Sequence, residues 1–132
     1  MIPQPAIILI LAFLAITFIQ SGYDKVTDWK GNLEWLKGHF SQTPIRNMVP
    51  HSLFLILVME VFSGAFAVIG IIEIFVNGGD QFPILAGVLS GITLLFLLLG
   101  QRMAKDYDGA RTIVIYFIPV VLLLHWLNAV AL

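Results

Sequence analysis

Glu60 is the residue of this sequence best placed to do chemistry, because it is an acid inside the apolar run from Leu53 to Phe75. A run of this length can cross a bilayer, which takes about 20 mostly apolar residues. A carboxylate at membrane depth costs roughly 2.5–3.5 kcal/mol on insertion scales unless it is paired, protonated or hydrated. Two interpretations have similar weight: Glu60 is paired and only fixes helix packing, or it belongs to a ligand or proton site.

Small residues follow Glu60 at helical spacing and predict that its face of the helix points into the protein. Such residues let neighbouring helices approach closely. They are Ser63, Gly64, Ala67 and Gly70. The bulky residues of the same run are then left for lipid: Leu55, Phe62, Phe66 and Ile69. Gly22, at the end of the first apolar run, and the GxxxG pair Gly87 and Gly91 are further predicted packing positions.

The composition is that of an integral membrane protein, since 59% of the 132 residues are hydrophobic and only 11% are charged. Soluble proteins carry about 25% charged residues. The chain has no cysteine, which excludes thiol–disulfide chemistry and thiolate metal ligands from it. We expect a single domain, no metal site and no nucleic-acid partner. The N-terminus lacks a basic region and a cleavage pattern, so we interpret it as a retained spanning segment.

Four apolar runs predict four transmembrane helices, at about residues 5–24, 52–76, 82–101 and 111–131, and hence an all-α membrane four-helix bundle. The turn Asn77–Asp80 separates the second and third. Between the first two helices, apolar residues recur at helical spacing and predict a short interfacial amphipathic helix: Trp29, Leu33, Leu36 and Phe40. A helix packed on the end of the bundle fits the same pattern equally well.

The basic residues predict the orientation of the bundle. With four spans, all 7 Lys and Arg residues fall on one side of the membrane, in the first and third loops. Cytoplasmic loops are enriched in Lys and Arg. We therefore expect a multi-pass protein of the inner (cytoplasmic) membrane with both termini on the non-cytoplasmic side.

This orientation brings polar residues of all four spans into the cytoplasmic half of the bundle. The candidate ligand-binding residues are Gln20, Lys25, Glu60, Arg102 and Tyr116. Lys25, Arg102 and Arg111 could each pair with Glu60, because long basic side chains reach inward along apolar surroundings. Lys25 and Arg102 are favoured, and nothing in the sequence decides between them. His125 lies in the outer half, where we expect a hydrogen bond to a neighbouring helix.

Two short motifs resemble a known family. The segment from Phe18 to Lys25, FIQSGYDK, resembles the F-x-x-S-G-x-x-K close of the first helix in DoxX-like proteins. The segment from Met59 to Gly64, MEVFSG, with Gly70 beyond it, is similar to the E-x-x-G-G second helix of that family, with Ser63 in place of the first glycine.

The resemblance implies a four-helix membrane bundle in which Gly22, Lys25 and Glu60 are the matching positions. Some relatives are small subunits of quinone-linked sulfur-oxidising enzymes, others are proposed to support redox complexes, and many have no known activity. The absence of cysteine means that the disulfide-exchanging role of other four-helix quinone enzymes does not transfer.

Three functions are therefore considered, in this order. The first is a small accessory subunit of a larger, redox- or respiratory-linked membrane complex, with other membrane subunits as partners and no catalytic activity of its own. The second is a membrane oxidoreductase subunit that binds a quinone or lipid in the polar cluster around Glu60. The third is a small transporter, which would need a homo-oligomer because four short spans without an evident repeat are a poor transporter.

Overall fold

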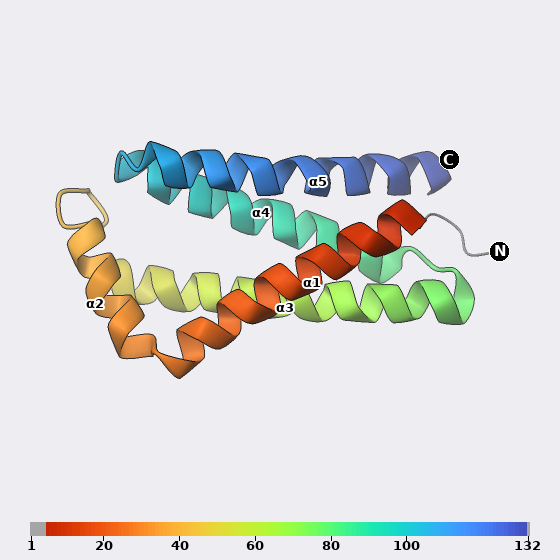
Figure 1. Ribbon diagram of the computed structural model, residues 1–132, viewed down its shortest axis with the longest axis horizontal. Coiled ribbons are helices and arrows are strands. Elements are labelled where there is room, and N and C mark those ends of the chain that lie inside the picture. Colours follow the sequence, from red (N-terminus) through yellow and green to blue (C-terminus); the bar gives the residue numbers. More distant parts are fainter. Residues whose placement is uncertain (1–4, 132) are drawn as a thin grey trace.

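The computed structural model describes residues 5–131, with side chains described as far as Leu127. Its helices are α1 (Pro5–Thr27), α2 (Trp29–His39), α3 (Val49–Asn77), α4 (Gln81–Met103) and α5 (Tyr107–Ala131) (Figure 1). All but α2 are long and apolar enough to cross a membrane, so the chain is a multi-pass membrane protein. The predicted all-α four-helix bundle is confirmed, and each helix extends a few residues beyond its predicted span.

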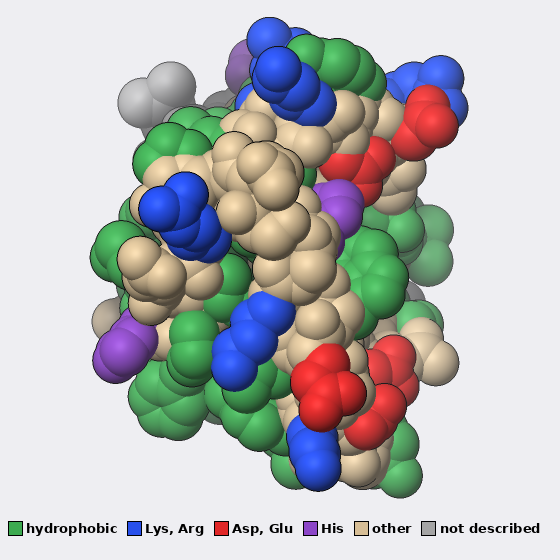
Figure 2. All heavy atoms as spheres, turned by 90° about the vertical axis from the view of Figure 1, so that its left-hand side faces the viewer, with side chains coloured by type: hydrophobic (Ala, Val, Ile, Leu, Met, Phe, Trp, Pro, Cys, Tyr) green, Lys and Arg blue, Asp and Glu red, His purple; other side chains and the backbone are tan. Residues whose placement is uncertain are grey.

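The bundle has two distinct ends. The start of α1, the end of α5 and the α3–α4 turn lie at one end, whereas α2 and the α4–α5 turn lie at the other (Figure 1). The α3–α4 turn is tight because Gly78 takes a left-handed conformation with φ 72° and closes the last turn of α3. Figure 2 looks onto the α2 end, where the Lys and Arg side chains gather. The one-sided set of basic residues is therefore a property of the folded bundle, while the side of the membrane that it faces stays a prediction.

Small residues allow close contact between successive spanning helices. All the predicted packing positions are buried: Gly22, Ser63, Gly64, Ala67, Gly70, Gly87 and Gly91. A methyl group added at Gly64 would lie 2.6 Å from Ile19 Cγ1, and one at Gly87 would lie 2.7 Å from Leu124 Cδ2. These glycines therefore admit a side chain of the neighbouring helix where a Cβ would stand.

The contact between α3 and α4 is a continuous line of small residues. A methyl group at Gly70 would lie 3.0 Å from Pro83 N, so the two backbones nearly touch there. The two helices are antiparallel, so residues that precede Gly70 in α3 lie at the same depth as residues that follow Pro83 in α4. This pairs Ala67 with Ala86 and Ser63 with Ser90, and all four residues are 0% exposed. Close approach of this kind increases van der Waals contact, which drives helix association in a membrane.

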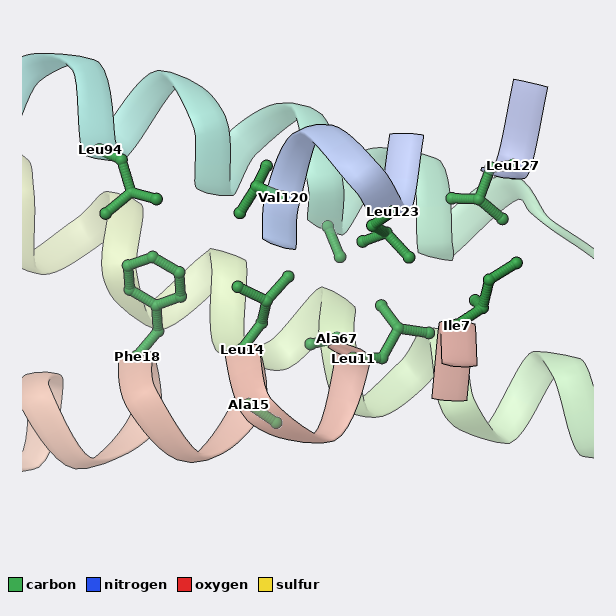
Figure 3. Packing of buried hydrophobic residues seen from close by; sticks show 11 residues of the cluster. Ile7, Leu11, Leu14, Ala15, Phe18, Ala67, Leu94, Val120, Leu123 and Leu127 are labelled. Carbon is green, nitrogen blue, oxygen red and sulfur yellow. The ribbon is translucent and has the colours of Figure 1, made fainter. Parts of the chain in front are cut away.

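Large apolar side chains fill the space between α1 and α5. Figure 3 shows Phe18, Leu14, Leu11 and Ile7 of α1 pointing toward Leu94 of α4 and toward Val120, Leu123 and Leu127 of α5. Each of these side chains is at most 2% exposed. The bundle is therefore closed by small-residue contacts along α1–α3–α4–α5 and by bulky side chains where α5 returns to α1.

Helix α2 lies across the end of the bundle at a steep angle to the long helices (Figure 1). Asp28 caps its N-terminus by accepting a hydrogen bond from Gly31 N at 3.2 Å. The predicted apolar face is half-buried and the opposite residues Lys30, Glu34 and Lys37 are exposed. The predicted amphipathic helix is thus confirmed, and it packs on the bundle end above α3 and α4. Its position in the headgroup region stays a prediction.

Candidate functional site

Glu60 lies on the small-residue face of α3 and is only 3% exposed. Ser21 donates a hydrogen bond from Oγ to Glu60 Oε2 at 2.8 Å, and Lys25 Nζ lies 2.9 Å from Glu60 Oε1. Lys25 also donates to Ser21 Oγ at 2.8 Å. Ser21 and Lys25 are four residues apart on α1, so they share a helix face. We call these three residues, Ser21, Lys25 and Glu60, the Glu60 cluster.

The pairing inside the cluster is ionic in character. The ammonium of Lys25 directs its hydrogen bond to Ser21, while Glu60 Oε1 receives no well-directed hydrogen bond from the described residues. At 2.9 Å the opposite charges still attract strongly whatever the angle, so the ion pair is the interaction that holds Oε1. Removing one partner of a buried pair costs on the order of 3–5 kcal/mol. The cluster therefore locks α1 to α3.

Only part of the predicted ligand site is assembled. Lys25 and Glu60 meet, but the other predicted members point elsewhere. Arg102 lies 5.4 Å over the ring of Tyr107, and Tyr116 packs edge-on against Phe13.

The remaining candidates also lie apart from Glu60. Gln20 is exposed on the side of α1 that faces away from the bundle. Arg111, the third possible partner of Glu60, pairs instead with Asp108 at 3.0 Å.

Close packing surrounds the Glu60 cluster. Ile19 occupies the space beside Gly64, where a ligand tail would have to pass. Val61 lies 3.3 Å from the position of a methyl group at Gly22. The structure thus supports the packing interpretation of Glu60 over a ligand site directly around it. Ser21 is the member that the sequence interpretation missed, although its spacing to Lys25 was a usable signal.

A cavity of about 450 Å³ lies next to the cluster, between α2, the start of α3 and the end of α4. Lys25 reaches its wall from α1, so this residue touches both the cluster and the cavity. The walls are mainly apolar, with side chains such as Leu36, Leu53, Ile56 and Leu97. The volume falls within the roughly 300–1,000 Å³ of typical small-molecule sites.

A second polar group borders the cavity on the side of α4. His39 Nε2 lies 3.0 Å from Gln101 Oε1 and 3.6 Å from Asp106 Oδ2. The ring of Trp35 stacks on His39 with centroids 4.6 Å apart. His39 belongs to α2 and Gln101 to α4, so these contacts hold α2 over the cavity.

Neither His39 nor Gln101 was a predicted site residue. The sequence signal was weak, because a histidine at the end of an amphipathic helix is usually a surface residue. Its neighbour Phe40 was part of the predicted apolar face, and the ring of Phe40 packs against Gly100 at the cavity wall.

The polar groups around the cavity are hydrogen-bond donors and acceptors without a nucleophile–base pair. Lys25, Asn32 and Ser52 line it together with His39 and Gln101. The described residues contain no group of three or more His, Asp or Glu side chains that could hold a metal ion. The arrangement is suited to holding a small polar headgroup beside apolar walls.

Other polar residues have structural roles at the opposite end. Glu73 accepts a hydrogen bond from Phe82 N at 2.8 Å, which caps the first turn of α4. His125 is exposed on α5. The predicted hydrogen bond from His125 to a neighbouring helix is not formed within the described part of the chain.

Comparison of the chain with known protein families, with curated proteins and with solved structures finds no match. The fold and its apolar helices define a class, namely a multi-pass four-helix membrane protein with an additional helix across one end. The resemblance to DoxX-like proteins stays a prediction.

Proposed function

We propose that this protein is a small accessory subunit of a larger membrane complex and carries no catalytic activity of its own. The observation that carries this proposal is Gln20, a polar residue on the outer side of a spanning helix. The redox or respiratory nature of the complex is part of the proposal, and it rests on the DoxX-like motifs alone.

Gln20 lies on a stripe of α1 that is turned away from the bundle. Leu9, Ile16 and Tyr23 recur every seven residues along this stripe and are 69%, 66% and 67% exposed. Gln20 lies among them, also exposed, one helical turn farther into the membrane than Asp24. Apolar residues on such a stripe have no hydrogen-bonding groups, so contact with lipid chains is sufficient for them. A primary amide needs a hydrogen-bond partner, which a neighbouring protein helix can supply.

The polar interior of the bundle is consistent with the same role. Glu60 is satisfied within the chain by Lys25 and Ser21, and Ile19 fills the space at Gly64. The polar group that faces outward is therefore the better candidate for contact with a partner. The transporter alternative gains no support from the bundle interior, which large apolar side chains fill.

Cysteine crosslinking in native membranes tests this proposal, because the chain has no cysteine of its own. Ile16→Cys places a single thiol on the α1 stripe, and Phe62→Cys places one on the lipid-facing side of α3, where Phe62 is 52% exposed. We expect a thiol-reactive benzophenone photocrosslinker, which inserts into C–H bonds and needs no amine at membrane depth, to join Ile16→Cys to a partner protein and to leave Phe62→Cys monomeric. Replacing Gln20 by Leu should lower recovery of the partner about threefold, the effect of an average interhelical hydrogen bond in a membrane.

The mass of the crosslinked product distinguishes a second copy of this chain from a different protein. A product with twice the mass of the chain would identify a second copy as the partner of α1. Equal crosslinking of Ile16→Cys and Phe62→Cys, or no product from either, would contradict the proposal that α1 carries the subunit contact.

A further inference from the structure

The cavity beneath α2 adjoins the Glu60 cluster only through Lys25 and does not include the α1 stripe. We propose that it binds an uncharged amphiphile whose headgroup carries carbonyl oxygens and whose apolar tail extends toward lipid. This proposal is independent of the accessory-subunit role, because it uses none of the outward-facing residues of α1.

The shape of the cavity fits a molecule with one polar end. Lys25 lines the cavity near α1, and His39 and Gln101 line it near the α4–α5 turn. Apart from Asn32 and Ser52, the rest of the wall is apolar. Leu55, Phe96 and Leu99 belong to this wall and are 50%, 48% and 56% exposed, so the apolar side of the cavity reaches the lipid-facing surface. A tail can therefore leave the cavity toward the bilayer without crossing polar groups.

The charges around the cavity favour a neutral headgroup. Each group in its wall that can carry a positive charge has a carboxylate of its own. Lys25 lies 2.9 Å from Glu60, and His39 lies 3.6 Å from Asp106. An anionic headgroup would have to compete with these carboxylates at close range, which is unfavourable. A carbonyl oxygen needs only a donor.

Donors are present where such a headgroup would lie. Lys25 donates one N–H to Ser21 Oγ, and its Nζ lies 2.9 Å from Glu60 Oε1. An ammonium has three N–H groups, so Lys25, which lines the cavity, keeps donor capacity for a headgroup oxygen. The hydroxyl of Ser52 and the amide of Asn32 also line the wall. Asn32 directs its NH₂ group to the backbone oxygens of Asp24 and Asp28, so it presents its carbonyl and the donors come from Lys25 and Ser52.

Trp35 provides a direct readout, because it lines the cavity and stacks on His39. One protein keeps Trp35 as its single tryptophan (Trp29→Phe with Trp126→Phe), and a matched protein keeps only Trp126, on α5. Both are placed in phosphatidylcholine nanodiscs and titrated with a short-chain benzoquinone, an uncharged dione that quenches tryptophan fluorescence. We expect saturable quenching of Trp35 and a weaker, linear response of Trp126 from quinone dissolved in the bilayer.

Two variants fill the cavity while leaving the ion pair intact. Gly100→Leu adds a side chain at the wall beside the Phe40 ring, and Ile56→Phe enlarges a second wall residue. Gly38→Leu is the matched control, since a Cβ at Gly38 meets nothing within 4 Å. Both filling variants should weaken quinone binding at least about tenfold, and the control should bind like the parent. Using two filling variants covers the case in which one of them does not fold.

Competition identifies the headgroup. Diacylglycerol, an uncharged amphiphile with ester carbonyls, should reduce the quenching of Trp35, whereas phosphatidylglycerol should have little effect. Stronger competition by phosphatidylglycerol would overturn the inference of a neutral headgroup. Linear quenching of Trp35, or equal saturation in the parent and in the folded filling variants, would overturn the binding site itself. Neither result would change the crosslinking of Ile16→Cys.

Discussion

A buried carboxylate in a membrane bundle is tolerated when its partners come from the same chain, and Glu60 has two. Ser21 and Lys25 both approach it from one face of α1. Glu60 is 4% exposed at its side chain, whereas Lys25 is 17% exposed and borders the cavity. The acid is therefore the member that depends most on the pair, because Lys25 has another direction in which to turn.

We expect Glu60→Ala to destabilise the bundle more than Glu60→Gln. Ala removes the counter-charge of Lys25 and the acceptor of the Ser21 hydroxyl and also leaves a void, while the Gln amide oxygen can still accept from Ser21 Oγ. Loss of a buried partner costs on the order of 3–5 kcal/mol, and the exposure of Lys25 places Glu60→Ala near the lower end of this range. Lys25→Met should cost at least as much, because it isolates the more deeply buried Glu60. Unfolding in detergent micelles, followed by circular dichroism, measures the stability of each variant and so ranks them.

The double variant Lys25→Met with Glu60→Leu is the control for this prediction. Replacing both members of a buried pair by apolar residues is often neutral or stabilising. The free energy of unfolding of the double variant should therefore be close to that of the parent and well above that of either single variant. Additive losses in the double variant would mean that the two residues do not act as a pair.

The sequence offered pairing with a basic residue as one of two equal interpretations of Glu60, and it did not decide which base. Depth alone admitted Lys25, Arg102 and Arg111. The choice depends on which helix lies beside α3 at the position of Glu60, and that helix is α1. The periodicity of an apolar helix does not determine which other helices lie beside it in the bundle. The identity of the basic partner could therefore not be predicted.

At the level of the helices, α3 is the element against which the others are arranged. It contacts α1 through Gly64 and α4 through Gly70 on the same small-residue face that carries Glu60. Lipid is as apolar as the helix surfaces, so helices gain little from hydrophobic burial and depend on close contact. Small changes in side-chain volume on this face should therefore have large effects.

Gly70→Ala tests this dependence. The added methyl group would lie 3.0 Å from Pro83 N and 3.2 Å from Pro83 Cα and Cδ, which are backbone and ring atoms that cannot rotate away. We expect a loss of about 1–3 kcal/mol from overpacking, only partly offset by the roughly 1 kcal/mol helix preference of Ala over Gly. Detergent unfolding again measures the difference.

Gly38→Ala is the matched control, because a Cβ at this position in α2 meets nothing within 4 Å. It should be neutral or slightly stabilising. If Gly70→Ala unfolds like Gly38→Ala, then α3 and α4 are not in backbone contact at Pro83, and the proposed depth pairing of Ser63 with Ser90 fails with it.

The same contrast between periodicity and packing applies to α2. Spacing of apolar residues was sufficient to predict the helix and its apolar face, and in the structure this face is half-buried. It could not predict the cavity, because the space beneath α2 depends on where the ends of α3 and α4 lie relative to it. His39 and Gln101 are 62 residues apart in sequence and meet only through this arrangement.

For the molecule as a whole, the distribution of charge is the property with the widest consequence. The Lys and Arg residues lie at the α2 end of the bundle (Figure 2). The cavity between α2, the start of α3 and the end of α4 lies at the same end. Retention of basic residues in the cytoplasm would place the mouth of the cavity at the inner leaflet. The orientation therefore decides which leaflet supplies the proposed amphiphile.

Accessibility of single cysteines in intact cells tests the orientation. Ser41 and Thr27 are exposed at the α2 end, and Gln81 is exposed at the start of α4 at the opposite end. These positions leave every Lys and Arg in place, so the substitutions do not alter the orienting charge.

We expect a membrane-impermeant maleimide to label Gln81→Cys in intact cells and to leave Ser41→Cys and Thr27→Cys unlabelled. The reason is that basic loops stay on the cytoplasmic side, and both positions at the α2 end lie among them. All three should react after the membrane is permeabilised, which shows that protection came from the membrane and not from the fold. Labelling of Ser41→Cys and Thr27→Cys but not of Gln81→Cys in intact cells would reverse the orientation. The cavity would then open to the outer leaflet, and its amphiphile would have to be drawn from there.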